Sequence, residues 1–562
     1  MHDIVIRNAL VVDGTGAPGR VTDVTVDGDL VTEVGTGVGG GRREIDAEGR
    51  ILAPGWIDVH THYDGQATWD PELTPSSWHG VTTAVMGNCG VGFAPVRRGE
   101  EEFLIELMEG VEDIPGTALH EGIDWRWEGF GEYLDALDSM PRTVDVAAQV
   151  PHTALRAFVM RDRAHEDASS DEIAEMADLL AEAVQAGAVG FTTSRTILHR
   201  SKHGLVPGTS APHDELRALA DAMGAVGGRR VFQVITDRLT VEPERSLLGE
   251  LARRAGGPLT LSLAQVDHDP QAWRDVLDDA SRWAAEGLRV APQVATRPTG
   301  MLFGLQSSLH PFIAHPSYAA LAELPLAERA AALRDPAVRE RLLAEESRTG
   351  VIGRMLMSKW GQMFRIGDPP VYEPDPSTSA AAVAERQGRT PEEVVLDWLA
   401  EDDGRAFLFA PLAGFSEHTL DPILEMLEHP TTVVGLGDGG AHCGLICDAS
   451  MCTYLLTHWV RDRQGGRLPL ERAVQLQTSG NAELYGFGDR GTITPGKRAD
   501  LNLIDLDALR IGTPEMTFDL PADARRIVQH AEGYDLTMLA GQVTYEGGEP
   551  TGARPGRLVR AG

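Results

Sequence analysis

The sequence predicts an α/β protein made of a (β/α)8 barrel, a β-sandwich formed from both chain ends, and a helical insertion late in the barrel. Three observations predict this architecture. Short apolar segments alternate with helical segments through the middle of the chain, strand and turn signals crowd both ends, and a long helical stretch precedes the last predicted strand. With 562 residues, the chain is long enough for one large domain and at least one smaller one.

The two ends of the chain have the same pattern, in which short alternating apolar strands are followed by tight turns. Near the start, the dipeptides 13–14 and 27–28 are both Asp-Gly, which is typical of hairpin turns. Strand candidates lie at residues 4–6, 10–12 and 24–26, and at the far end at 499–505 and 538–547. The ends therefore predict one β-sandwich domain built from residues 1–54 and 490–562.

The middle of the chain, residues 55–489, alternates strands with amphipathic helices. The best helix candidate, residues 170–186, has apolar residues at helical spacing behind a Ser-Ser-Asp-Glu start, which is typical of a capped helix. Strand candidates lie at residues 81–86, 189–192, 231–235, 259–263, 288–294 and 432–436. Eight such units predict a TIM-type barrel, in which active sites lie at the carboxyl ends of the strands.

Residues 310–400 separate the seventh predicted strand from the last one. They contain helical segments at 321–333, 337–345 and 391–399, with prolines between them. A connection of this length is uncommon inside a regular barrel. We expect an inserted helical subdomain that serves as a lid or an interface.

The formal charge of the chain is −34, from 50 basic and 84 acidic residues. A surface of this charge repels nucleic acid and anionic membranes, so we exclude both as partners. The chain opens without the basic and apolar segments of a signal peptide, and no apolar run reaches the length of about 18 to 20 residues that a membrane span needs. We therefore expect a cytoplasmic protein that acts on a small molecule, and the sequence leaves a homodimer open.

Four cysteines in a chain of this length do not predict a disulfide framework. Cys443, Cys447 and Cys452 lie close together, and the first two have helical spacing. A second zinc site at these residues would need a fourth ligand. We interpret the three as buried helix thiols.

An apolar run over residues 51–59 ends in two histidines, His60 and His62. Alternate residues of a strand point to the same face, so both imidazoles leave this strand together and form half of a metal site. Cys89 follows the next strand in a glycine-rich loop, and Asp438 follows the strand predicted at 432–436. All four side chains lie just past strand ends, where barrel active sites are built.

With these motifs the chain resembles the amidohydrolase superfamily, and within it the N-acyl-D-amino-acid deacylase (D-aminoacylase) branch. The resemblance covers nearly the whole chain and rests on residues 54–64 (PGWIDVHTHYD), 87–92 (GNCGVG), 434–439 (VGLGDG) and 491–500 (GTITPGKRAD). It implies a (β/α)8 barrel with a flanking β-sandwich. It also implies a metal-dependent hydrolase of a carbon–nitrogen bond other than a peptide bond.

The resemblance also assigns roles to single residues. It implies that His60, His62, Cys89 and Asp438 surround a zinc ion, which suits nitrogen, sulfur and oxygen ligands and lowers the pKa of a bound water to about 7. Asp438 is then the general base that takes a proton from this water and the acid that protonates the leaving amine.

The chain departs from the branch at two strands. The branch supplies a histidine from the fifth strand and another from the sixth, which complete a second metal position with the cysteine. Here residues 231–237 read VFQVITD and residues 259–265 read LTLSLAQ, without a histidine in either. Gln265 also stands where the branch has a lysine that helps to bind the substrate carboxylate. We expect one zinc ion, or another divalent transition metal, and an altered substrate.

Three interpretations of this departure are open. In the first, one metal remains on the ligands named above, and the enzyme still hydrolyses an amide-type bond. In the second, His152, His268 or His442 fills the gap. In the third, the barrel is a non-hydrolytic cyclase or lyase that uses the metal as a Lewis acid, or a catalytically decayed ligand-binding barrel. Because four candidate ligands remain in place, hydrolysis is the interpretation that we favour.

Two arginines follow predicted strands and are candidates for substrate binding. Arg195 follows the fourth strand and Arg297 the seventh. A guanidinium group can pair with a carboxylate through two parallel hydrogen bonds. We expect these arginines, His442 and Gln265 to contact the substrate.

Overall fold

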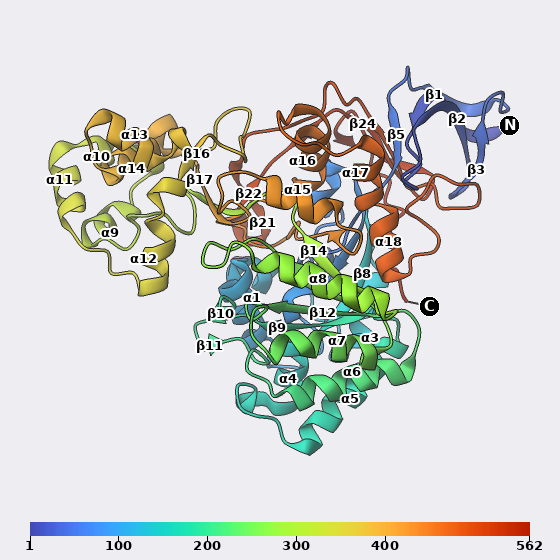
Figure 1. The fold of residues 1–562 in the computed structure, drawn as a ribbon, viewed down its shortest axis with the longest axis horizontal. Helices are drawn as coiled ribbons and strands as arrows, with labels where there is room; N and C mark the ends of the chain where they lie inside the picture. Colours follow the sequence, from blue (N-terminus) through green and yellow to red (C-terminus); the bar gives the residue numbers. More distant parts are fainter. Residues whose placement is uncertain (562) are drawn as a thin grey trace.

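The centre of the molecule is a barrel of eight parallel strands in chain order (Figure 1). A computed structural model describes the backbone of residues 1–561, and the side chains of all of these except residues 351 and 352. The barrel strands are β6 (Trp56–Asp58), β7 (Val81–Met86), β8 (Asp145–Pro151), β9 (Gly190–Arg195), β12 (Val231–Thr236), β13 (Leu259–Leu263), β14 (Val290–Val294) and β18 (Val433–Val434). The predicted TIM-type barrel is confirmed.

Backbone hydrogen bonds just past the first and last strands close the barrel at its carboxyl end. The N–H of Asp438 donates to the carbonyl of His60 over 2.9 Å, and the N–H of His62 donates to the carbonyl of Gly439 over 2.7 Å. Three of the residues expected to hold a metal, His60, His62 and Asp438, therefore lie in the backbone segments that complete the ring.

Helices cover the outside of the barrel (Figure 1). Four of them are α5 (Ser170–Gln185), α6 (His213–Val226), α7 (Glu244–Ala255) and α8 (Ala272–Ala285). Helix α5 matches the predicted helix at 170–186. It begins with a capping box between Ser169 and Glu172, and its buried face contains Met176 and Leu180.

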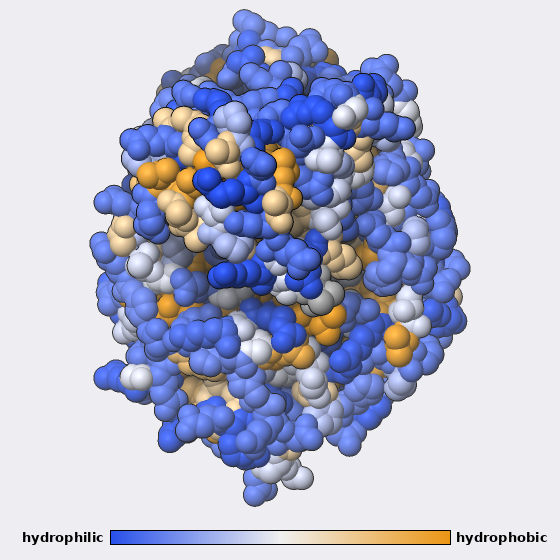
Figure 2. Space-filling model, turned by 90° about the vertical axis from the view of Figure 1, so that its left-hand side faces the viewer, coloured by the Kyte–Doolittle hydropathy of each residue, from blue (hydrophilic) through white to orange (hydrophobic). Residues whose placement is uncertain are grey.

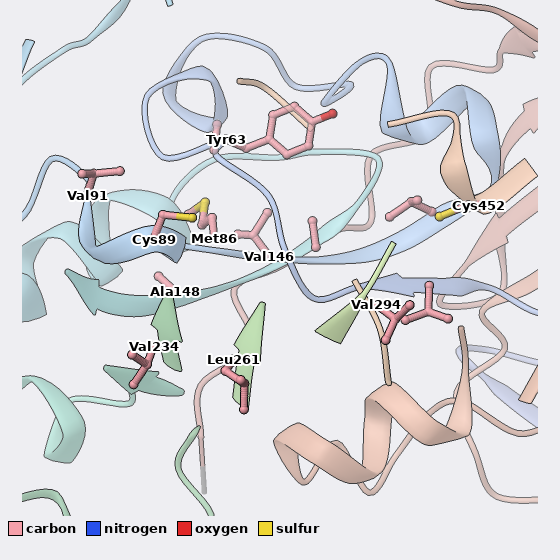
Figure 3. Packing of buried hydrophobic residues seen from close by; sticks show 14 of the residues in the cluster. Tyr63, Met86, Cys89, Val91, Val146, Ala148, Val234, Leu261, Val294 and Cys452 are labelled. Atoms are coloured by element: carbon pink, nitrogen blue, oxygen red, sulfur yellow. The ribbon is translucent and has the colours of Figure 1, made fainter. Parts of the chain in front are cut away.

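Apolar side chains on the outer face of the barrel strands pack under these helices. Figure 3 shows Met86, Ala148, Val234 and Leu261, which come from β7, β8, β12 and β13. All four are at most 1% exposed. Strands buried on both faces are typical of parallel sheets that helices cover.

The interior of the barrel has an apolar layer below a polar one. The lower layer contains Val85, Ala147, Val231, Ala291 and Val433, and it packs against helix α18 (Ser479–Tyr485). The polar layer contains three glutamines from the third, fifth and seventh strands: Gln149, Gln233 and Gln293. Side chains from alternate strands forming one layer are a regular feature of these barrels.

The chain ends pair in one nine-stranded sheet with the order β26-β25-β24-β19-β5-β1-β2-β3, in which β4 also pairs with β1. Its strands are β1 (His2–Val11), β2 (Arg20–Asp27), β3 (Leu30–Gly35), β4 (Gly41–Asp46), β5 (Ile51–Pro54), β19 (Leu501–Ile504), β24 (Tyr534–Leu539), β25 (Gln542–Glu546) and β26 (Glu549–Pro550). Residues 4–12, expected as two strands, lie mostly in the single strand β1. A bulge near Asn8, at φ 55°, separates the two apolar segments.

This sheet folds over so that its two ends meet. Gly541, in the turn between β24 and β25, lies against the turn between β2 and β3, and a Cβ at Gly541 would lie 1.9 Å from the carbonyl oxygen of Gly28. The sheet thus encloses its own apolar cluster, which includes Val26, Leu501 and Met538. A folded single sheet takes the place of the two separate sheets that a sandwich implies.

Two segments of the range 490–562 leave this sheet and pack on the barrel. The hairpin of β21 (Glu515–Leu520) and β22 (Ala524–Val528) reaches the barrel loops, where Ile527 donates its N–H to the carbonyl of Cys443. Near the end of the chain, the N–H of Val559 donates to the carbonyl of Val146 over 2.7 Å. The range 490–562, expected to belong to the β-sandwich, therefore also contains segments that pack on the barrel.

The insertion between β14 and β18 begins and ends on an antiparallel sheet of β15 (Thr299–Phe303), β17 (Leu408–Ala413) and β16 (Phe364–Arg365). Its helices are α9 (Pro316–Ala322), α10 (Leu326–Arg334), α11 (Pro336–Ala344), α12 (Val351–Met357), α13 (Ala380–Gln387) and α14 (Pro391–Leu399). Figure 1 shows them in yellow, projecting from the body of the protein, and they have an apolar cluster of their own.

The surface in Figure 2 is mostly hydrophilic, with small separate hydrophobic areas. Within the described part of the chain, no helix combines the length and apolar character needed to cross a membrane.

Candidate metal centre

His60 and His62 project into the carboxyl end of the barrel from the segment after β6. Both side chains are 1% exposed, and their rings make an edge contact with centroids 5.6 Å apart. The N–H of His60 donates to Oδ1 of Asp58 over 3.0 Å, which fixes the backbone before the first histidine. The HxH motif thus holds two buried imidazoles on one side of the chain, as the sequence predicts.

Cys89 lies in a tight loop directly after β7. Its φ of 57° is unusual for a residue with a side chain, and the preceding Gly87 has a φ of 81°. A Cβ at Gly87 would lie 2.3 Å from the carbonyl oxygen of Gln149, so glycine is required there for steric reasons also. The N–H of Cys89 donates to Oε1 of Gln233 over 3.0 Å, which holds the thiol over the barrel axis.

The segment after β18 also has an unusual backbone. Leu436, Asp438 and His442 have φ values of 64°, 45° and 53°. Each such residue costs about 1 kcal/mol or more, and clusters of them are typical of functional sites. The structure therefore holds Asp438 and His442 at the barrel mouth despite a local conformational cost.

Four candidate ligand atoms converge at this point. Nε2 of His60 lies 3.2 Å from Sγ of Cys89 and 3.3 Å from Oδ1 of Asp438. Nε2 of His62 lies 3.7 Å from the same Asp438 oxygen. Among the described residues, His60, His62 and Cys89 form a group whose ligand atoms all lie within 4.8 Å of one another.

These separations fit a metal ion. Zinc bonds of about 2.0 to 2.3 Å in tetrahedral geometry place neighbouring ligand atoms roughly 3.3 to 3.8 Å apart. In addition, both ring nitrogens of His62 are buried without a hydrogen-bond partner. Buried polar atoms are nearly always hydrogen-bonded, so this histidine is suited to bind a cation.

A hydrogen bond on the far side of His60 sets its tautomer. Nδ1 of His60 lies 2.6 Å from Oε1 of Gln293, which is an acceptor. Nδ1 therefore carries the proton, and Nε2 is free to bind a metal. In many metal-binding histidines, a carboxylate or carbonyl accepts the N–H of the ring nitrogen that does not bind the metal, and Gln293 is this acceptor for His60.

Glu112, at the end of helix α1 (Glu101–Glu112), is a site residue that sequence reasoning missed. It is 1% exposed, its Oε1 lies 3.5 Å from Nδ1 of His62, and its Oε2 lies 3.5 Å from Nε2 of His442. An acidic residue at a helix C-terminus is unfavourable with the helix dipole, and this placement is the signal by which Glu112 could have been found. His199, in the loop after β9, lines the same cavity and was also missed.

The electrostatics of the site favour a cation. Burial lowers the pKa of His60 to about 4 and raises the pKa of Cys89 to about 12. Burial opposes a charge on His62 as well, but Glu112 and Asp438 outweigh it and raise the pKa of His62 above its usual value. Two acidic groups thus draw positive charge to this point, and a bound cation would favour the Cys89 thiolate.

The fifth and sixth barrel strands contribute no histidine to the site. Gln233 of β12 donates through Nε2 to Oδ1 of Asn88 over 2.7 Å, and so supports the cysteine loop. On β13, Ser262 lines the cavity. Of the alternative histidines, His152 is hydrogen-bonded to Glu215 and does not line the cavity. The exposed His268 and the half-buried His442 do line it.

Three of the residues expected to bind substrate have internal partners instead, and this expectation is corrected. Arg195 Nη2 donates to Glu244 over 3.0 Å, and Arg297 Nη2 donates to Asp448 over 3.0 Å. Gln265 Oε1 accepts from the N–H of Ser416. None of these three borders the cavity, whereas His442 does. Buried guanidinium groups need a partner inside the protein, and the sequence did not reveal which acids supply it.

The other cysteines are also partly corrected. Cys443, Cys447 and Cys452 are buried free thiols, as expected. Only Cys452 lies in a helix, α16 (Met451–Tyr454), since Cys443 and Cys447 lie in the loop after β18.

A cavity of about 350 Å³ opens from the four converging side chains. Its walls are mainly apolar and come from the barrel loops, helix α8 and the strands at the base of the insertion. Pockets of about 300 to 1,000 Å³ with a few polar groups at one end are typical small-molecule sites.

Residues 43–545 match the amidohydrolase family. The chain belongs to that family. It is 29% identical over 578 residues to an N-acyl-D-aspartate deacylase of Alcaligenes xylosoxydans xylosoxydans, covering 100% of this chain and 95% of the relative. It is 26% identical over 567 residues to a D-aminoacylase of the same organism, covering 99% and 97%.

The folds agree as well. The structure of N-acyl-D-glutamate deacylase from Bordetella bronchiseptica, complexed with zinc and a phosphonate inhibitor, superimposes with a TM-score of 0.65 at 24% identity, covering 100% of both chains. The predicted membership of the amidohydrolases is confirmed, and this amidohydrolase is a hydrolase that acts on carbon–nitrogen bonds.

Proposed function

We propose that this protein hydrolyses an amide-type carbon–nitrogen bond other than a peptide bond, with one divalent transition metal held by His60, His62, Cys89 and Asp438. The observation that carries the proposal is the convergence of their ligand atoms at 3.2 to 3.7 Å. One of the four, His62, has buried ring nitrogens that lack hydrogen-bond partners. The nitrogen, sulfur and oxygen donor set favours zinc.

The comparisons support the same chemistry. Two relatives matched over nearly their whole length are named as deacylases or aminoacylases, and one structural neighbour contains zinc with a mimic of a tetrahedral intermediate. When bound, zinc supplies a water with a pKa of about 7 and polarises a substrate carbonyl.

Asp438 is the general base and acid in this proposal. Burial would raise its pKa, but His62, whose Nε2 lies 3.7 Å from Oδ1, and the nearby His60 and His442 hold the pKa of Asp438 well below its usual range. Its carboxylate is therefore ionised at neutral pH and takes a proton from the attacking water on Oδ2, because Oδ1 is the oxygen that faces His60 and His62. The same oxygen then gives the proton to the nitrogen of the leaving amine.

The remaining residues position these groups. Gln293 holds His60 in the tautomer with a free Nε2, and Glu112 faces Nδ1 of His62. The apolar walls of the cavity exclude bulk water, which strengthens the electrostatic interactions at the reacting atoms.

Metal analysis and isotope labelling test the proposal. Protein purified without added metal is expected to contain about one equivalent of a transition metal, and His60→Ala is expected to lose both the metal and the activity. In ¹⁸O-labelled water, an amide substrate is expected to yield a labelled carboxylic acid. A product without label would point to a cyclase or lyase, and metal-free protein with an unaffected His60→Ala variant would exclude the site altogether.

A further inference from the structure

Apart from the histidines, the charged side chains that line the cavity are acidic. Glu112 is buried beside the converging ligands, Asp438 is one of these ligands and is partly exposed, and Asp237 stands at the rim, where its Oδ2 accepts from the N–H of Ile197 over 2.8 Å. Among the described residues that line the cavity, there is no lysine or arginine.

Three basic residues near this site, Arg195, Arg297 and Lys359, have other partners. Arg195 and Arg297 pair with buried acids, as described above. Lys359 of the insertion pairs with Asp267 over 2.6 Å, next to the rim residue His268. These three side chains are therefore not free to pair with a substrate anion.

Two of the lining histidines, His199 and His442, do not replace such a cation. His199 shares a hydrogen bond of 2.9 Å between its Nδ1 and Oγ of Ser194, and burial keeps its ring neutral by lowering its pKa to about 3. His442 faces Glu112, so any charge on this ring is already matched by an acid.

Most of the remaining wall is apolar, with hydroxyl side chains such as Ser262 and Thr236 between the apolar ones. The apolar side chains include Leu198, Ile235, Leu263, Trp273, Val276 and Leu412. A carboxylate placed against these side chains would lose its hydration without gaining a partner, and it would also face the acids Glu112 and Asp438.

We propose that the substrate of this site is an uncharged amide with apolar groups on both sides of the reacting bond, in contrast to an N-acyl amino acid with a free carboxylate. This inference rests on the proposed hydrolysis for its reaction, but it concerns the walls of the cavity and not the metal ligands. An apolar neutral group gains from burial here, whereas an anion is repelled.

A matched pair of compounds separates the two classes. N-octanoyl-phenylalanine and N-octanoyl-phenylalaninamide have nearly the same shape and differ in the charge of one terminal group, and both enantiomers of each are to be used. For the metal-loaded protein, we expect kcat/KM for the carboxamide to exceed that for the carboxylate at least tenfold. We expect the same order of affinity in equilibrium binding.

A second experiment introduces a positive charge into the wall of the cavity. Ile235→Arg is expected to reduce the carboxamide preference at least tenfold relative to the neutral control Ile235→Met. Asp237→Asn, which leaves the apolar wall intact, is expected to shift the preference in the same direction. Asp178→Asn, on the exposed face of α5, is expected to leave the preference unchanged.

The outcomes distinguish this inference from the proposed function. If neither compound is hydrolysed but the carboxamide binds more tightly, hydrolysis of this amide fails while the assignment of the cavity holds. Equal or better binding of the carboxylate, or the absence of binding by both compounds, overturns the inference even if the enzyme is an active amidohydrolase.

Discussion

The backbone N–H of Asp438 donates a 2.9 Å hydrogen bond to the carbonyl oxygen of His60. The two residues are far apart in the sequence, and their side chains approach to 3.3 Å on the same side of this backbone contact. The bond that closes the barrel therefore also sets the distance between two proposed metal ligands. Barrel closure and metal binding are expected to stabilise each other.

Asp438→Asn separates the chemical role of this residue from its structural one. The main-chain bond to His60 remains, so we expect a folded protein, while loss of the carboxylate lowers kcat/KM by about 100- to 10,000-fold. Steady-state kinetics and circular dichroism check the two parts. A folded variant with nearly full activity would rule out Asp438 as the base.

Gln293→Leu removes the acceptor from Nδ1 of His60. Loss of a partner of this kind weakens metal binding by about 10- to 100-fold, because the ring is no longer held in the required tautomer. Competition with a chelator measures the effect, and Gln293→Glu, which keeps an acceptor, is expected to retain tight binding. Gln477→Leu is the matched control, since it removes a buried amide that has no partner.

Glu112→Ala tests the acid that links two histidines. Removing it takes away the negative group 3.5 Å from Nδ1 of His62, so we expect metal affinity to fall by about tenfold or more. The exposed Glu102 of the same helix gives the control Glu102→Ala, which is expected to bind metal normally. Equal metal affinities in the two variants would leave Glu112 without the positioning role.

Stability in acid is expected to depend on Glu215. Burial opposes its charge, but hydrogen bonds with His152 and Arg156 lower the pKa of Glu215 from 4.5 to about 2. The unfolded chain therefore binds a proton more readily, and the stabilisation of roughly 3 kcal/mol is fully present above about pH 4.5 and is lost as the pH falls through about 2.

Urea unfolding of the wild type and Glu215→Gln measures this contribution. We expect the difference in unfolding free energy to be largest at pH 7 and to fall to about half near pH 3. Glu175→Gln, on the exposed face of helix α5, is the control and is expected to show a small difference at both values. A Glu215→Gln difference that does not vary with pH would contradict the assignment.

Asp145 joins the floor of the barrel to the segments that follow it. Its Oδ2 accepts hydrogen bonds from Arg490 over 2.6 Å and Arg498 over 3.0 Å, and the carboxylate is fully buried. Asp145→Asn leaves two buried cations with weaker partners, so we expect a loss of about 3 kcal/mol or more of stability.

Asp489, a more exposed partner of Arg490, provides the comparison for Asp145. Asp489 is 44% exposed and also pairs with Arg490, so Asp489→Asn is expected to cost about 1 kcal/mol or less. Thermal and urea unfolding check both values. Similar losses for the two variants would show that burial does not set the strength of this contact.

The sequence predicted the barrel because most of its strands are β-branched apolar runs with turns on each side. It missed the third strand, β8, whose residues Asp145–Pro151 contain two alanines, a glutamine and a terminal proline. Packing from both sides buries all seven residues, and this tertiary environment outweighs their weak strand propensity.

The candidate ligands were predicted for a related reason. His60, Cys89 and Asp438 each follow a recognisable strand, and parallel strands bring their carboxyl ends together. Glu112 and His199 lie in long connections whose course depends on contacts distant in sequence. The partners of Arg195 and Arg297 were hidden in the same way, because nothing local in the sequence identifies a buried acid that lies 49 or 151 residues away.

The insertion contributes Thr299, Leu412 and Ala413 to one wall of the cavity and none of the proposed ligands. It also has its own apolar cluster, so its interior can change without disturbing the barrel. Evolution can thus replace or resize this segment to alter which molecules reach the centre while the reacting groups stay fixed. Changes in the insertion alone can therefore adapt the same reaction to new substrates, because the insertion lines one wall of the cavity.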